Sequence, residues 1–310
     1  MPGKCEVYDC MTVRATPLEQ EAVPTRSKPL WKRYPLYGYL AIALNLTFWF
    51  FAWSHIGFLS RYSFFPLWFS FILVLDALNK ARSDSSLLTR APAKFAQMFL
   101  LSALFWWLFE TFNIPIQNWH YIYDHNYSTA EQLLVQTLDF TTVLPVVMEM
   151  AELWTSFKAL RPRLPAYEVG PRVSAATATR LLLLGGACIV LPFLFPHQAF
   201  MLIWLSVVLL LDPINNLMGR KSALAHLKAR DWRFFVALPL AALSCGFFWE
   251  MWNFFSLPKW YYTVPYVGFG KVFEMPILGY TGYLPFALEL FALYQFLLAF
   301  LNQKQDALTF

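Results

Sequence analysis

Residues 249–262 read WEMWNFFSLPKWYY, and residues 109–121 read FETFNIPIQNWHY. In both stretches a glutamate is followed by an asparagine three positions later and, further along, by a Trp-x-Tyr element. These residues are Glu110, Asn113, Trp119 and Tyr121 in the first copy and Glu250, Asn253, Trp260 and Tyr262 in the second. Polar and aromatic residues that recur at matched spacings within apolar surroundings indicate an internal duplication.

The duplication extends on both sides of these stretches. Trp68, Ser70, Asp76, Asn79, Pro145 and Glu149 of the first copy correspond to Trp204, Ser206, Asp212, Asn215, Pro285 and Glu289 of the second. The spacing from tryptophan to aspartate is eight residues in both copies, and the spacing from proline to glutamate is four. The offset between the copies begins at 136 residues and settles at 140 or 141, so the chain is built from two related halves.

The composition is that of a protein that crosses a membrane several times. Of the 310 residues, 58% are hydrophobic and 14% are charged, whereas soluble domains carry roughly a quarter charged residues. The net charge of +5 does not indicate nucleic-acid binding, because the Lys and Arg residues lie in short loops between apolar blocks. As partners we expect membrane lipids and a hydrophobic substrate from the lipid phase, and no nucleic acid; no oligomeric state is predicted.

Eight apolar blocks are long enough to cross a bilayer as helices, which takes about 20 residues each. They lie near residues 35–54, 62–79, 95–113, 138–158, 179–196, 199–218, 233–254 and 282–301. Since each copy holds four, both copies enter the membrane in the same direction, as parallel repeats do. The predicted fold is an all-α, polytopic membrane bundle of about eight transmembrane helices in two parallel four-helix repeats.

The same pattern divides the chain into five parts. We expect a flexible cytoplasmic tail over residues 1–34, repeats over 35–158 and 179–301, a cytoplasmic linker over 159–178 and a C-terminal tail over 302–310. Of the 24 Lys and Arg residues, only Arg61, Lys259 and Lys271 fall on the side opposite the termini. Because positively charged loops stay in the cytoplasm, both termini are predicted to be cytoplasmic, in a multi-pass protein of a bacterial inner membrane.

Four glutamates inside the predicted helices are the candidate catalytic residues. Charged groups in a membrane are costly and need a partner or a purpose. Glu110 and Glu250 lie near the outer ends of the third helices. Glu149 and Glu289, one turn after a proline, are expected at a similar depth in the outer halves of the fourth. Burial favours the protonated form of a carboxyl group, so these residues could act as general acids; the alternative is that they only tie helices together.

Asparagines and aromatic residues near the glutamates are the candidate substrate-binding residues. Asn113 and Asn253 follow the glutamates by one helical turn and could hydrogen-bond their carboxyl groups. Aromatic walls tolerate a developing positive charge, and the candidates for them are Trp107, Trp119, Tyr121, Trp249, Trp260 and Tyr262. The outer loops at 114–137 and 255–281, which carry most of these aromatics, could fold as flaps over the helix ends or form an ordinary interfacial belt.

A second constellation lies at the cytoplasmic ends of the second and sixth helices, where Asp76-x-x-Asn79 and Asp212-x-x-Asn215 occur. Oxygen ligands at this spacing could hold Mg²⁺ and a diphosphate, and they partly resemble the Asp-rich motifs of the UbiA-type prenyltransferases. The alternative is that these residues end their helices. We predict no cofactor and no metal site, with Asp76 and Asp212 as the alternative metal ligands; the scattered histidines argue against a di-iron site.

The duplicated unit, its intramembrane acid, its Trp-x-Tyr element and its proline-led acidic motif resemble the membrane-integral lycopene cyclases of the heterodimeric or fused type. In that family two related helical units combine, and carboxylates are thought to protonate the end of a polyene and trigger ring closure. The resemblance implies that Glu110 and Glu250 are the intramembrane acids, and that Pro145 with Glu149 and Pro285 with Glu289 form the proline-acid motif. The family's motif has paired acids two and three residues after the proline and about three helices per unit, whereas this chain has single acids four residues after it and four helices.

Three kinds of function are consistent with the sequence. The first is an enzyme that modifies an isoprenoid, a carotenoid or another lipid by acid–base chemistry from its glutamates, as a cyclase does. The second is a non-enzymatic subunit that binds a pigment, a quinone or partner helices. The third is a proton-coupled transporter, which parallel repeats and intramembrane acids allow; Mg²⁺-dependent prenyl transfer at the aspartates is a further alternative. We favour the enzyme.

Overall fold

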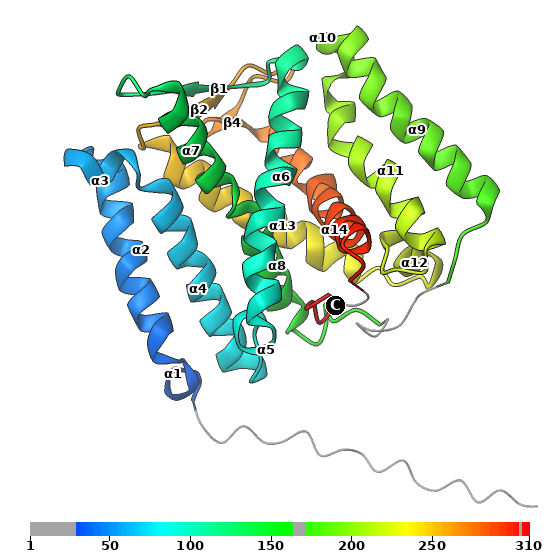
Figure 1. Cartoon of the computed structure of the whole chain (residues 1–310), viewed down its shortest axis with the longest axis horizontal. Helices are drawn as coiled ribbons and strands as arrows, with labels where there is room; N and C mark the ends of the chain where they lie inside the picture. The colour runs from blue at the N-terminus through cyan, green and yellow to red at the C-terminus, as the bar shows by residue number, and fades with distance from the viewer. Residues whose placement is uncertain (1–28, 164–170, 304–305) are drawn as a thin grey trace, which may run out of the picture.

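The computed structural model describes residues 29–163, 171–303 and 306–310 and shows a helical bundle (Figure 1). The predicted all-α fold with eight membrane-spanning helices is confirmed. The first repeat consists of α2 (Leu36–Ser54), α4 (Phe64–Ser83), α6 (Pro92–Ile116) and α7 (Thr129–Phe140) followed directly by α8 (Val143–Thr155). The first and third spans of the second repeat are α9 (Ala175–Leu194) and α13 (Phe234–Phe254). Its second span consists of α10 (Pro196–Ala199), η1 (Phe200–Leu202) and α11 (Ile203–Leu217), and its fourth consists of η2 (Ile277–Gly282) and α14 (Tyr283–Phe300). Short helices lie between the spans, namely α1 (Leu30–Arg33), α3 (Gly57–Arg61), α5 (Leu87–Arg90) and α12 (Ala223–Lys228).

The helices pack in the same way in both repeats. In the first, α2 packs on α4 and α4 on α8; in the second, α9 packs on α11 and α11 on α14. The repeats also interlock, because α13 of the second packs on α8 of the first and α6 packs on α14. In α2 and α9 only 22% of the apolar stretch that crosses the membrane is buried inside the protein, against 56% in α13 and α14. The helices α2 and α9 therefore lie at the periphery and expose their apolar side chains to lipid.

The fourth span starts nine residues earlier than predicted, at Thr129 instead of 138. Ser128 and Glu131 form a capping box, in which each side chain accepts a hydrogen bond from the backbone N–H of the other residue, and this begins α7. The interruption at Thr141 and Thr142 then separates α7 from α8. Much of the segment predicted as an outer loop, residues 129–137, is therefore part of the helix α7.

A two-stranded ribbon joins the repeats at one end of the bundle (Figure 1). Strand β1 (Trp119–Ile122) pairs antiparallel with β2 (Lys259–Tyr262), so that Trp119 lies opposite Tyr262 and Tyr121 lies opposite Trp260. The Trp-x-Tyr element of the first repeat thus pairs antiparallel with the Trp-x-Tyr element of the second, so that each tryptophan lies opposite a tyrosine. That arrangement is what a two-fold axis through the ribbon produces when two parallel repeats meet around it. A second small hairpin, β3 (Lys271–Val272) with β4 (Met275–Pro276), lies in the loop that follows β2.

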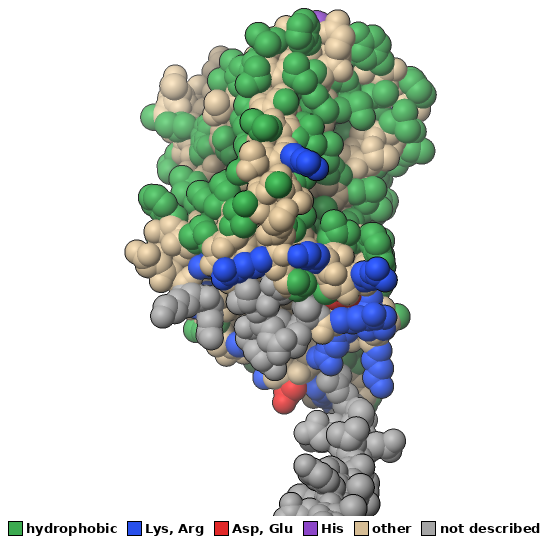
Figure 2. Space-filling model, turned by 90° about the vertical axis from the view of Figure 1, so that its right-hand side faces the viewer, with side chains coloured by type: hydrophobic (Ala, Val, Ile, Leu, Met, Phe, Trp, Pro, Cys, Tyr) green, Lys and Arg blue, Asp and Glu red, His purple; other side chains and the backbone are tan. Residues whose placement is uncertain are grey.

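The C-terminal segment is not a free tail. Ala307, Leu308 and Phe310 are buried. Asp306 accepts a hydrogen bond of 2.8 Å from Nζ of Lys221, with which it also forms an ion pair. Residues 1–28, 164–170 and 304–305, and with them most of the predicted N-terminal tail and part of the linker, lie outside the described residues. Figure 2 shows most of the basic side chains of one face gathered in a band at the end away from the ribbon, with one further basic side chain higher up in the largely apolar surface above the band.

Candidate functional site

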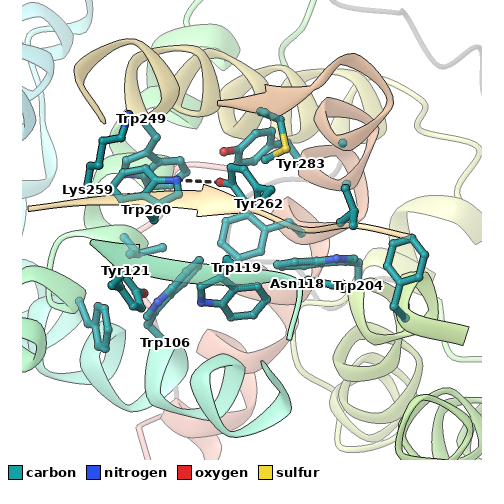
Figure 3. A pocket seen from close by; sticks show the side chains of 18 of the residues that line it. Trp106, Asn118, Trp119, Tyr121, Trp204, Trp249, Lys259, Trp260, Tyr262 and Tyr283 are labelled. Carbon is teal, nitrogen blue, oxygen red and sulfur yellow. Dashed lines mark hydrogen bonds between the residues drawn. The ribbon is translucent and has the colours of Figure 1, made fainter. Parts of the chain in front are cut away.

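A cavity of about 720 Å³ lies between the repeats, directly under the ribbon (Figure 3). Its wall is mostly apolar and comes from both halves. It is rich in aromatic side chains, including Trp106, Trp119, Tyr121, Phe140, Trp204, Trp249, Trp260, Tyr262, Tyr283 and Phe286. This size and lining suit an apolar molecule as large as a lipid or a drug. The fold and this site together define a multi-pass membrane protein with an aromatic cavity at the interface of two repeats.

Most of the predicted aromatic residues lie on this cavity. Trp119, Tyr121, Trp249, Trp260 and Tyr262 all line it. Trp107 does not: its indole N–H donates to Oγ1 of Thr137 at 3.1 Å, and its neighbour Trp106 lines the cavity in its place. Sequence spacing alone could not separate these two adjacent tryptophans, because their sides of α6 become distinguishable only once α7 is in place.

Glu110, on α6, contacts both residues of the first Trp-x-Tyr element. Its Oε1 accepts hydrogen bonds from the indole N–H of Trp106 at 2.9 Å, the indole N–H of Trp119 at 3.0 Å and the hydroxyl of Tyr121 at 2.6 Å. All three donors line the cavity, while Glu110 itself does not. Burial raises the pKa of the Tyr121 phenol well above its usual value, and the Glu110 carboxylate adds to the shift, so Tyr121 keeps its proton.

Glu250 occupies the equivalent place in the second repeat and is fully buried. Its Oε1 accepts hydrogen bonds from the hydroxyls of Tyr262 at 2.7 Å and Tyr283 at 3.0 Å, and the indole of Trp260 donates to the Tyr262 hydroxyl at 2.8 Å (Figure 3). Oε2 of Glu250 has no hydrogen-bond partner among the described residues. Burial, and next the charge of Glu250, raise the pKa of the Tyr262 phenol well above its usual value.

Asn113 and Asn253 do not bind the glutamates, as the sequence had suggested, but hold the ribbon. Nδ2 of Asn113 donates to the carbonyl of Trp119 at 2.8 Å, and Nδ2 of Asn253 donates to the carbonyl of Trp260 at 2.8 Å. The Oδ1 atoms accept from the backbone N–H groups of Asn118 and Trp260, both at 2.8 Å. The prediction was wrong because the buried backbone at the start of each strand needs partners that no neighbouring strand supplies.

Glu149 and Glu289 lie away from the cavity wall, and the four glutamates do not share one depth. Glu149 accepts a hydrogen bond of 2.8 Å from Asn79, near the Ser83 end of α4, which is the end opposite the ribbon. Glu289 accepts a hydrogen bond of 3.1 Å from the backbone N–H of Val207. Both are fully buried between helices. The prediction of similar depth was wrong for Glu149, because its partner Asn79 lies near the end of α4, whereas Val207, the partner of Glu289, lies in the first half of α11.

The aspartates of the possible Mg²⁺ site instead cap the short helices α5 and α12. Asp212 accepts from the backbone N–H groups of Ala223 at 2.7 Å and Leu224 at 2.8 Å, and Asp76 accepts from that of Leu88 at 2.9 Å. Both carboxylates are buried. Within the described ranges there is no group of three or more His, Cys, Asp and Glu side chains able to hold a metal ion. Both oxygens of Asp212 are thus engaged as a helix cap, whereas Asp76 caps α5 with Oδ2 and accepts a hydrogen bond of 2.5 Å from the hydroxyl of Tyr37 with Oδ1.

Several residues of the cavity were not predicted from the sequence, among them Trp204, Tyr283 and the polar residues Tyr123, Gln132, Gln136 and Asp139. Tyr123, Gln132 and Gln136 lie in the segment predicted as an outer loop, and Asp139 lies at the start of the predicted fourth span. The Ser128-x-x-Glu131 pattern that begins α7 is visible in the sequence and places Gln132 and Gln136 on a helix.

Comparison with known proteins finds no match: no family model, no curated protein and no solved structure is significantly similar to the chain. The resemblance to lycopene cyclases accordingly rests on the residue pattern alone. What the site does has to be argued from its own geometry.

Proposed function

We propose that the cavity binds an elongated apolar molecule from the lipid phase, of the isoprenoid, carotenoid or related lipid class, and that the protein is an integral membrane enzyme that acts on it by acid–base chemistry. One observation carries this proposal. In both repeats a glutamate that is shielded from the cavity bonds directly to a tyrosine that lines it, namely Glu110 to Tyr121 and Glu250 to Tyr262. The residue-pattern resemblance to cyclases points to the same class of chemistry.

The hydrogen bonds suggest a route for a proton. In the structure the hydroxyls of Tyr262 and Tyr283 donate to Glu250. In the proposed route Glu250 is neutral and one of these hydrogen bonds is reversed: the carboxyl group donates its proton to the tyrosine hydroxyl while that hydroxyl passes its own proton to the bound molecule. The proton given to the substrate is then replaced from the glutamate, and no free phenolate is formed. A positioned acid of this kind contributes typically about 10²–10⁴-fold to a rate. Glu110 and Tyr121 offer the same route in the first repeat.

The cavity wall suits the charge that such a protonation creates. Adding a proton to a carbon–carbon double bond leaves a carbocation, which the faces of aromatic rings stabilise. Trp119, Trp204 and Trp249 line the cavity beside the tyrosines. A wall of this kind also keeps water, which would quench the cation, away from the reacting carbon.

A second candidate is a protein that binds such a molecule without changing it. The observation that favours it is the number of donors on Glu110: three hydrogen bonds to one oxygen fix a carboxylate firmly and could serve only to shape the cavity wall. The two candidates make opposite predictions for variants in which the carboxyl groups are replaced by amides.

The experiment is expression of the full chain in a host that accumulates an acyclic polyene such as lycopene, with chromatographic analysis of the pigments. Under the enzyme proposal, wild type gives a new product, which Glu250→Gln or Glu110→Gln reduces strongly. Glu274→Gln, a change in a carboxylate that pairs with Lys259 in the loop after β2, serves as the matched control. Unchanged pigment that co-purifies with wild type and with both variants would favour the binding protein; neither product nor bound pigment, from folded protein, would remove this substrate.

We also propose that the basic end faces the cytoplasm of a bacterial-type inner membrane, with both termini on that side. The support is the band of Lys and Arg away from the ribbon, since positive loops are retained inside. After Cys5 and Cys10 are replaced by serine, a membrane-impermeant maleimide added to whole cells should label Asn126→Cys, on the ribbon side, but not Arg230→Cys. The reverse labelling would invert the proposed topology.

A further inference from the structure

Four polar side chains on α7 and the segment before it form one wall of the cavity, which the proton route does not use; tyrosines aside, Asn118, Gln198, Lys259 and Thr281 are the other polar residues of the lining. The four are Tyr123, Gln132, Gln136 and Asp139. Asp139 is the one carboxylic acid among the lining residues that the structure describes. A polar wall in a mostly apolar cavity indicates where a polar part of the bound molecule would lie.

The hydroxyl of Tyr123 has a proton to offer to the cavity. It accepts hydrogen bonds from Nε2 of Gln132 at 2.9 Å and Nε2 of Gln136 at 2.8 Å. A phenol oxygen has two acceptor positions and one O–H donor, so both acceptor positions are filled and the donor remains. Burial raises the pKa of Tyr123, which therefore stays protonated at neutral pH.

Asp139 adds a second group beside it. None of the ion pairs between described residues involves Asp139, whose carboxyl group lies beside the backbone N–H of Phe65. An unpaired negative charge facing aromatic walls is costly, so the neutral acid, which carries an O–H donor, suits this place. Lys259 also lines the cavity but is paired with Glu274.

This wall has no counterpart in the second repeat. Glu149 corresponds to Glu289, an offset of 140, and the same offset takes Gln132, Gln136 and Asp139 to Val272, Pro276 and Gly279. None of these three side chains can donate a hydrogen bond. The polar cluster on α7 and the segment before it therefore has no equivalent at the matching positions of the second repeat. A molecule whose polar end binds this cluster would lie in the cavity in one orientation.

We propose that the molecule bound in the cavity is an oxygenated apolar lipid, a long hydrocarbon with a hydroxyl or carbonyl oxygen at one end, and that this oxygen accepts hydrogen bonds from Tyr123 and Asp139. The inference rests on the proposed function, since it names the class of molecule for the same cavity. The hydrocarbon body lies along the tryptophans, and the oxygen end points toward α7.

The test compares two probes with one carbon skeleton, a C20 isoprenoid alcohol and the corresponding C20 hydrocarbon. The full chain in lipid nanodiscs is titrated with each, and quenching of the fluorescence of the cavity tryptophans is measured, with both affinities corrected for partitioning into the lipid. The alcohol is expected to bind at least about tenfold more tightly than the hydrocarbon, roughly the effect of one well-placed hydrogen bond.

Tyr123→Phe and Asp139→Leu should each reduce this preference without weakening hydrocarbon binding. Tyr127→Phe is the matched control, because Tyr127 also lines the cavity but its hydroxyl donates to the carbonyl of Arg61 at 3.4 Å. If Tyr123→Phe does not fold, Gln136→Leu, which removes one donor to Tyr123, takes its place. Equal affinity for both probes would overturn this inference and leave the apolar site intact, whereas no binding of either probe would overturn the proposed function itself.

Discussion

The hydroxyl of Tyr262 lies 2.7 Å from Oε1 of Glu250 and donates a hydrogen bond to it. The tyrosine belongs to the ribbon and the glutamate to α13, so this contact fastens the ribbon to the membrane-spanning helices. Tyr121 and Glu110 repeat it at 2.6 Å in the other half. Because each tyrosine also lines the cavity, one contact serves both the architecture and the proposed proton route.

Replacing Tyr262 by phenylalanine separates these two roles. Tyr262→Phe keeps the aromatic wall but removes the donor to Glu250, leaving the bond from Tyr283 at 3.0 Å. We expect product formation to fall by at least about tenfold, which is less than the about 10²–10⁴-fold contributed by a positioned acid because Tyr283 can still donate. The control is Tyr261→Phe, since Tyr261 stacks on His120 and does not line the cavity. Product formation by Tyr262→Phe at the wild-type rate would exclude Tyr262 from the proton route.

Gly246 leaves the space that Tyr283 occupies. A Cβ atom on Gly246 would lie 2.5 Å from Cε2 of Tyr283, so Gly246→Ala must displace the ring that bonds to Glu250. We expect the free energy of unfolding to fall by about 1–3 kcal/mol, the usual cost of overpacking. Unfolding by titration with a denaturing detergent measures it.

Gly186→Ala is the matched control for that variant, because it makes the same substitution inside another membrane-spanning helix. No atom lies within 4 Å of a Cβ built on Gly186. Alanine there should leave stability unchanged or raise it by up to about 1 kcal/mol, the difference in helix propensity. Equal effects of the two changes would contradict the crowding argument for Gly246.

The spacing of polar and aromatic residues was sufficient to predict the duplication, and the lengths of the apolar blocks were sufficient to predict the eight spans. A Glu, an Asn and a Trp-x-Tyr element recurring among apolar residues constrain the architecture because buried polar groups tolerate few positions. The pairing of Trp119 with Tyr262 could not be predicted in this way. It joins segments that lie more than a hundred residues apart, and local periodicity carries no information on which distant strands meet.

For the site, too, local sequence patterns predicted which residues take part, but not the contacts that these residues make with distant segments. Trp119, Tyr121, Trp260 and Tyr262 were predicted from their recurrence, and Trp249 from its place beside Glu250. All five line the cavity. The predicted hydrogen bonds from Asn113 and Asn253 to the glutamates were wrong, because a spacing of three residues indicates only that two side chains share a helix face. The buried backbone of the ribbon, which lies next to the asparagines only in the folded protein, needs hydrogen-bond partners, and the asparagine side chains bind it instead of the glutamates.

The two asparagines should act together in stabilising the ribbon. Asn113→Ala and Asn253→Ala each remove hydrogen bonds to buried backbone groups, and each is expected to lower the free energy of unfolding by about 1–3 kcal/mol. Because both hold strands of one ribbon, the double variant should deviate from additivity by about 0.5 kcal/mol or more. Asn126→Ala, in an exposed loop, is the control. Strictly additive effects would show that the strands are held independently.

Asp212 gives a test of the helix-cap role against the metal-site alternative. Its carboxylate accepts two backbone hydrogen bonds at the start of α12, so Asp212→Ala should lower the free energy of unfolding by about 1–3 kcal/mol. Millimolar Mg²⁺ or a chelator should leave the thermal midpoint of the wild type unchanged. If Mg²⁺ raised that midpoint, and Asp212→Ala or Asp76→Ala abolished the increase, the Mg²⁺ hypothesis would replace the cap.

His226 predicts a loss of stability in mild acid. It is buried on α12, its ring stacks on Phe234 at 4.1 Å, and its Nδ1 lies 3.3 Å from Oδ2 of Asp231. Burial lowers the pKa of the imidazole below 6.5, although Asp231 opposes the shift and Lys221 adds slightly to it. The neutral ring is thus favoured in the folded state, so its contribution to stability is complete above pH 6.5 and is lost as the pH falls through the lowered pKa.

The measurement is the thermal midpoint of the detergent-solubilised protein as a function of pH from neutral to mildly acidic conditions. The wild type should lose stability below about pH 6.5, and His226→Gln should flatten that part of the curve because glutamine does not titrate. His197→Gln, a change at an exposed histidine, should leave the curve as it is in the wild type. A wild-type midpoint that stays constant down to pH 5, or an acid loss that persists in His226→Gln, would show that protonation of His226 does not destabilise the fold.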